Sequence, residues 1–383
     1  MKRNYIAKRF QNAGSGLTLD TEALAKYKDI IDLSIGDTDF ITDEGIINAA
    51  FRDAKAGYTR YGDPKGDLEL IDAVCRAWQE DFEQKLPHDH VLVSASSCLG
   101  MALVMFSILD PGDEVIVFSP YFPMYRTQIE LAGGVCVDVP TYASEDYAID
   151  EARLRAAITP RTKAIIFNNP TNPTGMAYGN DTLEMLARVA KEYDLLIAAD
   201  EIYTTYLYEG DFRPLRTLPG MAERTITLNS FSKNFLMTGW RVGVIIAEPE
   251  LLEVMNDING SLIYTAPSIS QRAAIHALSM RREIREKYVT AYRDRIFYTA
   301  DRIEKIPYLS LVRPKGTFYL FPSIEKTGLT DDEFCNVLLD KAHVLVSHGK
   351  AFGTAGAGHF RIACTVGIDT LKIAFDRMEK LSF

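Results

Sequence analysis

The sequence predicts an α/β fold, with a mainly parallel, seven-stranded sheet in a large domain and a smaller α+β domain beside it. Three observations carry this prediction. Short apolar segments alternate with helical patterns through the middle of the chain. The polar motifs mostly follow the ends of these segments, where open α/β sheets bind their ligands. With 383 residues, 47% of them hydrophobic, the chain is longer than one typical domain and can bury a substantial core.

Seven short apolar runs are the predicted strands of the large sheet. Helical patterns such as Asp181–Tyr193 alternate with them through much of this region, which favours parallel strands covered by helices. The predicted strands are Val91–Val93, Glu114–Phe118, Gly134–Val139, Lys163–Phe167, Leu195–Ala199, Thr225–Leu228 and Arg241–Ile246.

The C-terminal part of the chain predicts a second, smaller unit. Apolar runs at Thr317–Phe321, Val344–Ser347 and Phe360–Cys364 are predicted strands. Helical stretches cover Asp331–Lys341, between these strands, and Ile368–Leu381, after them. Such a mixture is typical of an α+β domain.

Charge and composition narrow the classes of partner. A net charge of -10 and a pI near 5.2 argue against nucleic acid or an anionic membrane, so any anion site must be made locally. The five cysteines are odd in number and scattered, which favours a reducing cytoplasm. The six histidines show no metal-ligand spacing, and the basic start lacks the apolar core of a signal peptide.

The run Leu228–Lys233, with Arg241 eight residues further on, carries the most specific chemistry. A lysine that forms a covalent bond must lose its proton near neutral pH, whereas an ordinary lysine titrates near ~10.4. The hydroxyls of Ser230 and Ser232 and the Arg241 guanidinium suit a phosphate dianion. The pattern therefore indicates a site for a phosphorylated aldehyde that condenses with Lys233, although a polar loop with a solvated lysine would look similar.

Two more motifs end predicted strands. Asn169–Gly175 follows one apolar run, and its prolines hold the Asn172 amide where it can donate to an anionic oxygen. Asp200–Tyr203 follows the next run, and an aspartate there can pair with a protonated ring nitrogen. Together the three motifs indicate a ring cofactor at one edge of the sheet.

With these motifs the chain resembles the class I/II aminotransferases, pyridoxal 5'-phosphate enzymes of fold type I, over essentially its whole length. The resemblance implies that pyridoxal phosphate is the cofactor, that Lys233 forms its Schiff base and moves the substrate proton, and that Asp200 pairs with the pyridine nitrogen. The other cofactor contacts that it implies are Tyr203 and Asn172 with the phenolic oxygen, and Ser230, Ser232 and Arg241 with the phosphate.

Further residues take their predicted roles from this resemblance. The turn Ser96-Ser97-Cys98 matches the one whose backbone N–H groups hold the phosphate, although the family usually shows a glycine there. Phe122 matches the aromatic residue that stacks on the pyridine ring. Arg361 matches the arginine that binds the substrate α-carboxylate. The predicted substrate contacts are Gly36, Asn172 and Arg361.

The resemblance also implies a domain division and a homodimer with shared active sites. Residues 1–45 would form an N-terminal arm and part of the small domain, residues 46–280 the large cofactor domain, and residues 281–383 the rest of the small domain. Tyr61, in a Gly/Pro-rich segment, matches the tyrosine that reaches the phosphate of the neighbouring subunit. A turn tyrosine is the alternative for this residue.

Three functions are compatible with these motifs. An aminotransferase moves an amino group from an amino acid to a 2-oxo acid. A carbon-sulfur β-lyase on the same scaffold shares all the cofactor residues, and release of ammonia and pyruvate from cystathionine without an oxo acid would identify it. A non-enzymatic binding module, as in transcription regulators, needs a DNA-binding domain in front, whereas only about 35 residues precede Gly36.

Substrate preference rests on one position. Aspartate-specific relatives need a cation for the distal carboxylate, and one subgroup places a lysine where this chain has Cys98. A neutral side chain there predicts a preference for neutral or apolar amino donors, with glutamate or 2-oxoglutarate as exchange partner, because an unpaired buried carboxylate costs several kcal/mol. Arg60, Arg126 or an arginine of a neighbouring subunit is the alternative source of charge.

Overall fold

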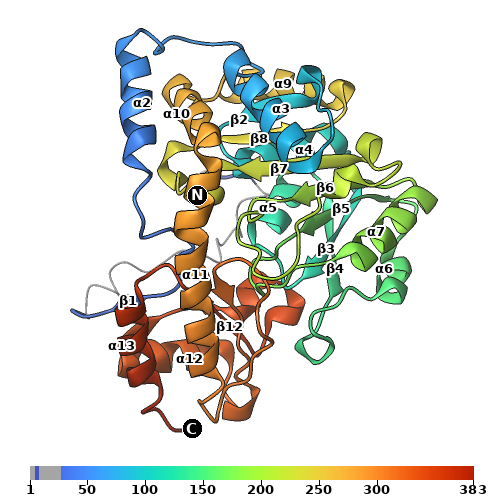
Figure 1. The fold of residues 1–383 in the computed structure, drawn as a ribbon. Helices are drawn as coiled ribbons and strands as arrows, with labels where there is room; N and C mark the ends of the chain where they lie inside the picture. The colour runs from blue at the N-terminus through green and yellow to red at the C-terminus, as the bar shows by residue number, and fades with distance from the viewer. Residues whose placement is uncertain (1–4, 8–26) are drawn as a thin grey trace.

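The computed structural model describes residues 5–7 and 27–383, so most of the predicted N-terminal arm lies outside the described residues. A seven-stranded sheet crosses the large part of the molecule (Figure 1). Only β8 runs antiparallel to its neighbours, and the other adjacent pairs are parallel, so the predicted sheet is confirmed. The strand order is β2 (Val91–Ser94), β8 (Gly243–Ile246), β7 (Thr225–Ser230), β6 (Leu196–Asp200), β5 (Thr162–Asn168), β3 (Glu114–Ser119) and β4 (Val135–Pro140).

Helices cover both faces of this sheet because its strands are apolar on both sides. Leu92 and Ile245 belong to a core with α4, α5 and α9, whereas the alternate residues Val93 and Val244 pack with α3 and α10. Helices α6 and α7 cover the part of the sheet around β5 and β6. The helices are α2 (Glu44–Lys55), α3 (Leu68–Phe82), α4 (Ser97–Ile108), α5 (Met124–Leu131), α6 (Glu151–Ala157), α7 (Asn180–Glu192), α8 (Phe231–Asn234), α9 (Pro249–Leu262) and α10 (Ser268–Ser279).

The C-terminal part forms a second core around a three-stranded antiparallel sheet, ordered β11-β12-β9. The long helix α11 (Arg281–Ile303) runs from the upper part of Figure 1 to this sheet. The remaining elements are β9 (Tyr319–Leu320), α12 (Asp331–Val337), β10 (Val344–Leu345), β11 (Ser347–His348), β12 (Phe360–Ala363) and α13 (Ile368–Met378). The domain boundaries at 45/46 and 280/281 stay a prediction.

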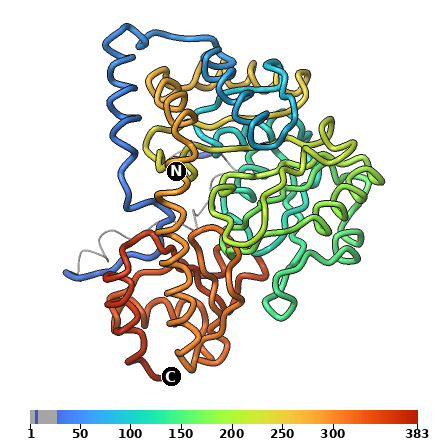
Figure 2. Tube along the Cα trace, in the orientation of Figure 1, coloured from blue at the N-terminus to red at the C-terminus, as the bar shows by residue number. Residues whose placement is uncertain are grey.

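An early segment of the chain joins this C-terminal part. Strand β1 (Ile31–Asp32) pairs in parallel with β10, so that Ile31 lies opposite Val344. Figure 2 shows the blue segment running beside the red one. The predicted strand Val344–Ser347 is therefore two strands, because β10 pairs with β1 whereas β11 pairs with β12.

Three element ends differ from the prediction for backbone reasons. Strand β8 begins at Gly243 and not at Arg241, because Arg241 has φ +55° and a left-handed residue interrupts a strand. Thr317 has φ +59°, so β9 begins at Tyr319. The predicted helix Asp331–Lys341 is α-helical to Val337 and continues as a π-helical turn.

No helix within residues 5–7 and 27–383 is both long and apolar enough to cross a membrane.

Candidate active site

A cavity of about 780 Å³ lies at the carboxyl ends of β5, β6 and β7, and the C-terminal part of the chain closes its far side. Among the predicted site residues only Tyr61 does not line it. Those that do are Gly36, Ser96, Ser97, Cys98, Phe122, Asn172, Asp200, Tyr203, Ser230, Ser232, Lys233, Arg241 and Arg361.

Lys233 lies in the short helix α8, directly after β7. The Ser230 hydroxyl caps this helix by accepting from the Ser232 N–H at 3.1 Å. The Lys233 amine donates to the backbone carbonyl of Gly36 and lies 5.9 Å from the centre of the Phe318 ring. Within the described chain no carboxylate forms an ion pair with Lys233, so the amine is held only by a carbonyl group that a ligand can replace.

Asp200 ends β6 and is buried, and its two carboxylate oxygens differ. Oδ2 accepts a hydrogen bond from the Tyr125 hydroxyl, whereas Oδ1 has no partner among the described residues. Burial raises the pKa of Asp200 to about 6, against the lowering effect of the Tyr125 hydrogen bond. A protonated nitrogen in the cavity would supply both the missing donor and the missing charge, so the site fits a pyridinium ring.

Arg361 lies on β12 and is only 5% exposed. Its guanidinium donates to Asn172 Oδ1 at 3.0 Å, to the Ser34 carbonyl and to the Ser347 hydroxyl at 3.3 Å. In the part of the chain that the structure describes, Nε has no partner and no carboxylate pairs with this side chain. Burial lowers the pKa of Arg361. Because a buried, unpaired guanidinium is costly, this position is a ready site for a ligand carboxylate.

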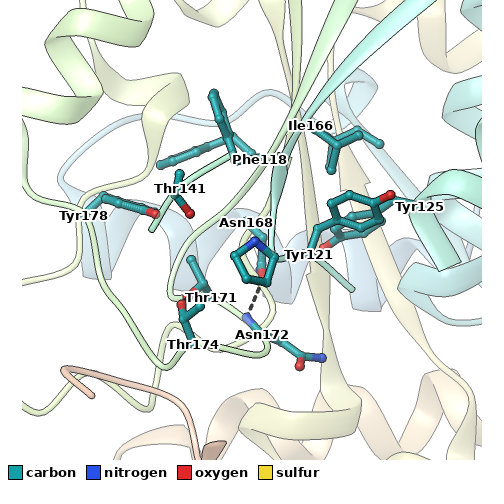
Figure 3. Close-up of a pocket in the computed structure, with 13 residues that line it drawn as sticks. Phe118, Tyr121, Tyr125, Thr141, Ile166, Asn168, Thr171, Asn172, Thr174 and Tyr178 are labelled. Carbon is teal, nitrogen blue, oxygen red and sulfur yellow. Dashed lines mark hydrogen bonds between the residues drawn. The ribbon is translucent and has the colours of Figure 1, made fainter. Parts of the chain in front are cut away.

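Asn172 is held from two sides. Its backbone N–H donates to Asn168 Oδ1 at 2.8 Å, the dashed line in Figure 3, beside a second cavity of about 20 Å³. That small cavity has room for about one water molecule. Since Oδ1 of Asn172 accepts from Arg361, the amide nitrogen is left to donate elsewhere.

The turn between β2 and α4 takes a shape that normally needs glycine. Ser96 has φ +85° and ψ 153°, and its hydroxyl caps α4 by accepting from the Leu99 N–H at 3.4 Å. The Ser97 hydroxyl donates to the Asn229 carbonyl at 2.6 Å. The turn thus brings the start of α4 to the cavity, where its free N–H groups favour an anion. Arg241 lines the cavity and donates to the Thr238 carbonyl at 2.8 Å.

Aromatic side chains form much of the remaining wall. The Tyr203 and Tyr319 hydroxyl oxygens are 3.1 Å apart. Burial raises the pKa of Tyr203, so its hydroxyl stays protonated. Phe122 lines the cavity and packs edge-to-face on Tyr125, with ring centres 5.6 Å apart. These residues keep the wall largely apolar.

Tyr61 is the predicted site residue that this chain does not bring to the cavity. It lies between α2 and α3, is 86% exposed, and packs edge-to-face on Tyr264 at 5.2 Å. Nearby, the Thr265 hydroxyl donates to the Asp63 carbonyl at 3.1 Å. The predicted role of Tyr61 at a neighbouring subunit stays a prediction.

Several residues that shape the site carry no motif. Tyr125 and Tyr319 have the spacing of ordinary core aromatics, and only the fold brings them to Asp200 and Tyr203. The Ser34 carbonyl, just after β1, and the Ser347 hydroxyl, on β11, reach Arg361 from segments that are far apart in the sequence. Among the described residues no group of three or more His, Cys, Asp or Glu side chains could hold a metal ion.

Comparison with known proteins gives consistent matches. The family model for class I and II aminotransferases matches residues 28–378. An aspartate aminotransferase of Pyrococcus abyssi is 36% identical over 362 residues, 93% of this chain and 92% of that protein. Aromatic-amino-acid aminotransferase 2 of Thermococcus litoralis is 36% identical over 356 residues, 92% of this chain and 91% of that protein.

The structural comparison agrees. The solved structure of an aspartate aminotransferase from Thermus thermophilus with maleate has a TM-score of 0.93 and 32% identity, covering 99% of this chain and 100% of that one. The fold and the aminotransferase activity expected from the sequence are thus confirmed. The chain belongs to the class I and II aminotransferase family.

Proposed function

We propose that the cavity binds pyridoxal 5'-phosphate and that the enzyme uses it to move an amino group between an amino acid and a 2-oxo acid. The observation that carries this proposal is that two charged side chains in one cavity, a carboxylate and a guanidinium, lack partners of opposite charge. Among residues 5–7 and 27–383, no group donates to one oxygen of Asp200, and no carboxylate pairs with the buried Arg361 guanidinium. A protonated ring nitrogen and a substrate carboxylate meet these needs, and Lys233 lines the same cavity.

The residues present fit the parts of this cofactor. The phosphate would take the N–H groups at the start of α4, with Ser96, Ser97 and Cys98, and the side chains of Ser230, Ser232 and Arg241. Asp200 would pair with the ring nitrogen, and Phe122 would stack on the ring face. Tyr203 and Asn172 would donate to the ring oxygen.

When bound, the cofactor supplies an electron sink for the bonds at the substrate α-carbon. The protein supplies position and proton transfer. Arg361 orients the α-carboxylate by two parallel N–H donors. The Lys233 amine would accept the proton from the substrate α-carbon and later donate it again, acting first as base and then as acid. Gly36 lines the cavity without a side chain, which lets its backbone lie against the Tyr319 hydroxyl.

The assembly that we propose is a homodimer with shared sites. Apolar side chains are exposed around Tyr61, which supports a protein contact there. They include Leu68 at 64%, Leu262 at 54% and Tyr264 at 46% exposure. All five cysteines are free thiols, which supports the proposed cytoplasmic location.

The test is to replace Lys233 by alanine. The variant should bind pyridoxal phosphate without a covalent bond that borohydride can fix, and turnover should fall by several orders of magnitude. Lys163→Ala is the matched control, because Lys163 pairs with Asp113 and does not line the cavity. If borohydride still fixes the cofactor to the Lys233 variant, another lysine does the work. Ammonia release from wild type without an oxo acid would indicate the lyase instead.

A further inference from the structure

Tyr319 contacts three of the predicted site residues at once. It lies on β9, is 2% exposed and lines the large cavity. Its hydroxyl oxygen is 3.1 Å from that of Tyr203, and the Arg361 guanidinium carbon lies 4.5 Å from the centre of its ring. A Cβ atom added at Gly36 would overlap the Tyr319 hydroxyl, so that hydroxyl lies directly against the Gly36 backbone.

The backbone before Tyr319 is held in a costly conformation. Thr317 has φ +59°, which is rare and unfavourable for a β-branched residue. Its hydroxyl accepts from the Tyr319 N–H at 3.1 Å, and its own N–H donates to the Tyr206 carbonyl at 2.7 Å. Such strain persists where the surroundings fix one conformation, and here the two hydrogen bonds hold the backbone that leads into Tyr319.

Either hydroxyl could donate in the Tyr203–Tyr319 hydrogen bond, and counting protons shows what each direction implies. A phenol has one proton. If Tyr203 donated to Tyr319, it would have no proton for an oxygen in the cavity. If Tyr319 donates, the Tyr203 proton is free, and the incoming hydrogen bond makes Tyr203 a stronger donor.

We propose that Tyr319 is a positioning residue that donates to the Tyr203 oxygen, directing the Tyr203 proton at the cofactor ring oxygen, and whose ring supports Arg361. The hydroxyl and the ring thus act on different groups. The hydroxyl acts through Tyr203 on the electronic state of the cofactor. The ring stabilises the guanidinium by a cation–π contact and keeps it aligned for the substrate carboxylate. This inference rests on the proposed pyridoxal phosphate site.

The test compares Tyr319→Phe and Tyr319→Leu in the cofactor-loaded enzyme. The first measurement is the pH midpoint at which the visible absorption band of the bound cofactor changes. A hydrogen-bond donor to the ring oxygen favours the deprotonated form of the bound cofactor and so lowers this midpoint. Tyr319→Phe should raise this midpoint by roughly half a pH unit. In a Tyr203→Phe background the same change should have no further effect. Tyr319→Leu also removes the ring. Its KM for the amino acid donor should be about fivefold higher than the KM of Tyr319→Phe.

Tyr292→Phe is the matched control. Tyr292 is buried in the same aromatic cluster, 5.2 Å from the Phe318 ring, and its hydroxyl bonds Thr38 at 2.6 Å. The Tyr292→Phe substitution should lower thermal stability without moving the pH midpoint of the visible absorption band. An unchanged midpoint in Tyr319→Phe, or an equal shift with and without Tyr203, overturns the proposal. If wild type shows no pH-dependent visible band, the proposed function fails, which is a different outcome.

Discussion

The Tyr125 hydroxyl donates a hydrogen bond to Oδ2 of Asp200, while Oδ1 of the same carboxylate has no partner among the described residues. Tyr125 comes from α5 and Asp200 from the end of β6, so the fold supplies a side-chain donor to one oxygen of this carboxylate. The other oxygen is left for a ligand. Without one, the charged form of Asp200 is disfavoured, and its pKa rises to about 6.

This relationship predicts a pH-dependent cost in the cofactor-free protein. Because the folded pKa of Asp200 is above its unfolded value, its favourable contribution is present below about pH 4 and is lost as the pH rises through about 6. Asp200→Asn should therefore be more stable than wild type at pH 8, by up to about 3 kcal/mol, and similar at pH 4. Denaturant unfolding of the two apoproteins across this range measures the difference.

The neighbouring Glu201 provides the control. Burial raises the pKa of Glu201 to about 8, so in both proteins its own loss of stability begins near its unfolded pKa, overlaps that of Asp200 and continues to about pH 8. Glu201→Gln should remove this loss, including its part above pH 6, and leave that of Asp200. An Asp200→Asn curve parallel to that of wild type between pH 4 and pH 7 would contradict the assignment.

Replacing Ser96 by glycine should stabilise the protein. The backbone at φ +85° and ψ 153° costs on the order of 1–3 kcal/mol for a residue with a Cβ, and glycine removes this cost. Part of the gain is offset by the more flexible unfolded chain and the lost helix cap, so we expect a net gain of about 1 kcal/mol. Thermal unfolding measures it, with Ser96→Ala, which keeps the strain and loses the cap, expected to lower the melting temperature.

Changing Tyr61 to phenylalanine tests the shared site. Within residues 5–7 and 27–383 of one chain, the exposed Tyr61 hydroxyl makes no hydrogen bond. Its loss should therefore leave the unfolding free energy unchanged within about 0.5 kcal/mol. In the proposed dimer the same change removes a phosphate contact, and the Kd for pyridoxal phosphate should rise about tenfold. Equilibrium dialysis at a dimeric protein concentration measures this Kd, and an unchanged value would mean that Tyr61 does not reach the cofactor.

The amino donor should be neutral or apolar. The Lys and Arg side chains that line the cavity are Lys233, Arg241 and Arg361 within the described chain, and each has a proposed partner. Arg126, an alternative source of charge, pairs with Asp138 at 2.7 Å and does not line the cavity. We expect kcat/KM for methionine and phenylalanine to exceed that for aspartate by at least about tenfold.

Cys98→Lys is the matching gain-of-function variant for this prediction. It places a cation at the start of α4 and should raise kcat/KM for aspartate relative to methionine. A wild-type preference for aspartate of about a hundredfold, or ~2.7 kcal/mol, would show that another cation serves the distal carboxylate. Arg60 and an arginine of the neighbouring subunit would then be the candidates for that cation.

The sequence predicted those parts of the site that follow directly from strand ends. Lys233, Asp200 and Asn172 each come just after an apolar run, and parallel strands bring such ends to one edge of a sheet. The seven predicted strands are all present, within about two residues at each end. Local patterns suffice here because neighbouring strands pair through backbone hydrogen bonds, which need no particular side chain.

The sequence could not predict the contacts that depend on distant pairing. Tyr125 and Tyr319 look like core aromatics until the fold places them beside Asp200 and Tyr203. The positive φ of Ser96 could not be predicted for another reason: glycine commonly adopts this conformation, whereas serine rarely does. Strand β8 runs against its neighbours, and no feature of its apolar run distinguishes it from a parallel strand.

The pairing of β1 with β10 has a consequence for synthesis of the enzyme on the ribosome. Ser34 and Gly36 follow β1, whereas Ser347 and Arg361 emerge only after most of the chain has been translated. A nascent chain can therefore assemble the sheet that carries Lys233 well before it can assemble the arginine side of the cavity. The late closure joins segments across most of the chain length and is costly in entropy. The contacts of Arg361 with Ser34 and Ser347 thus form only after β12 has been translated.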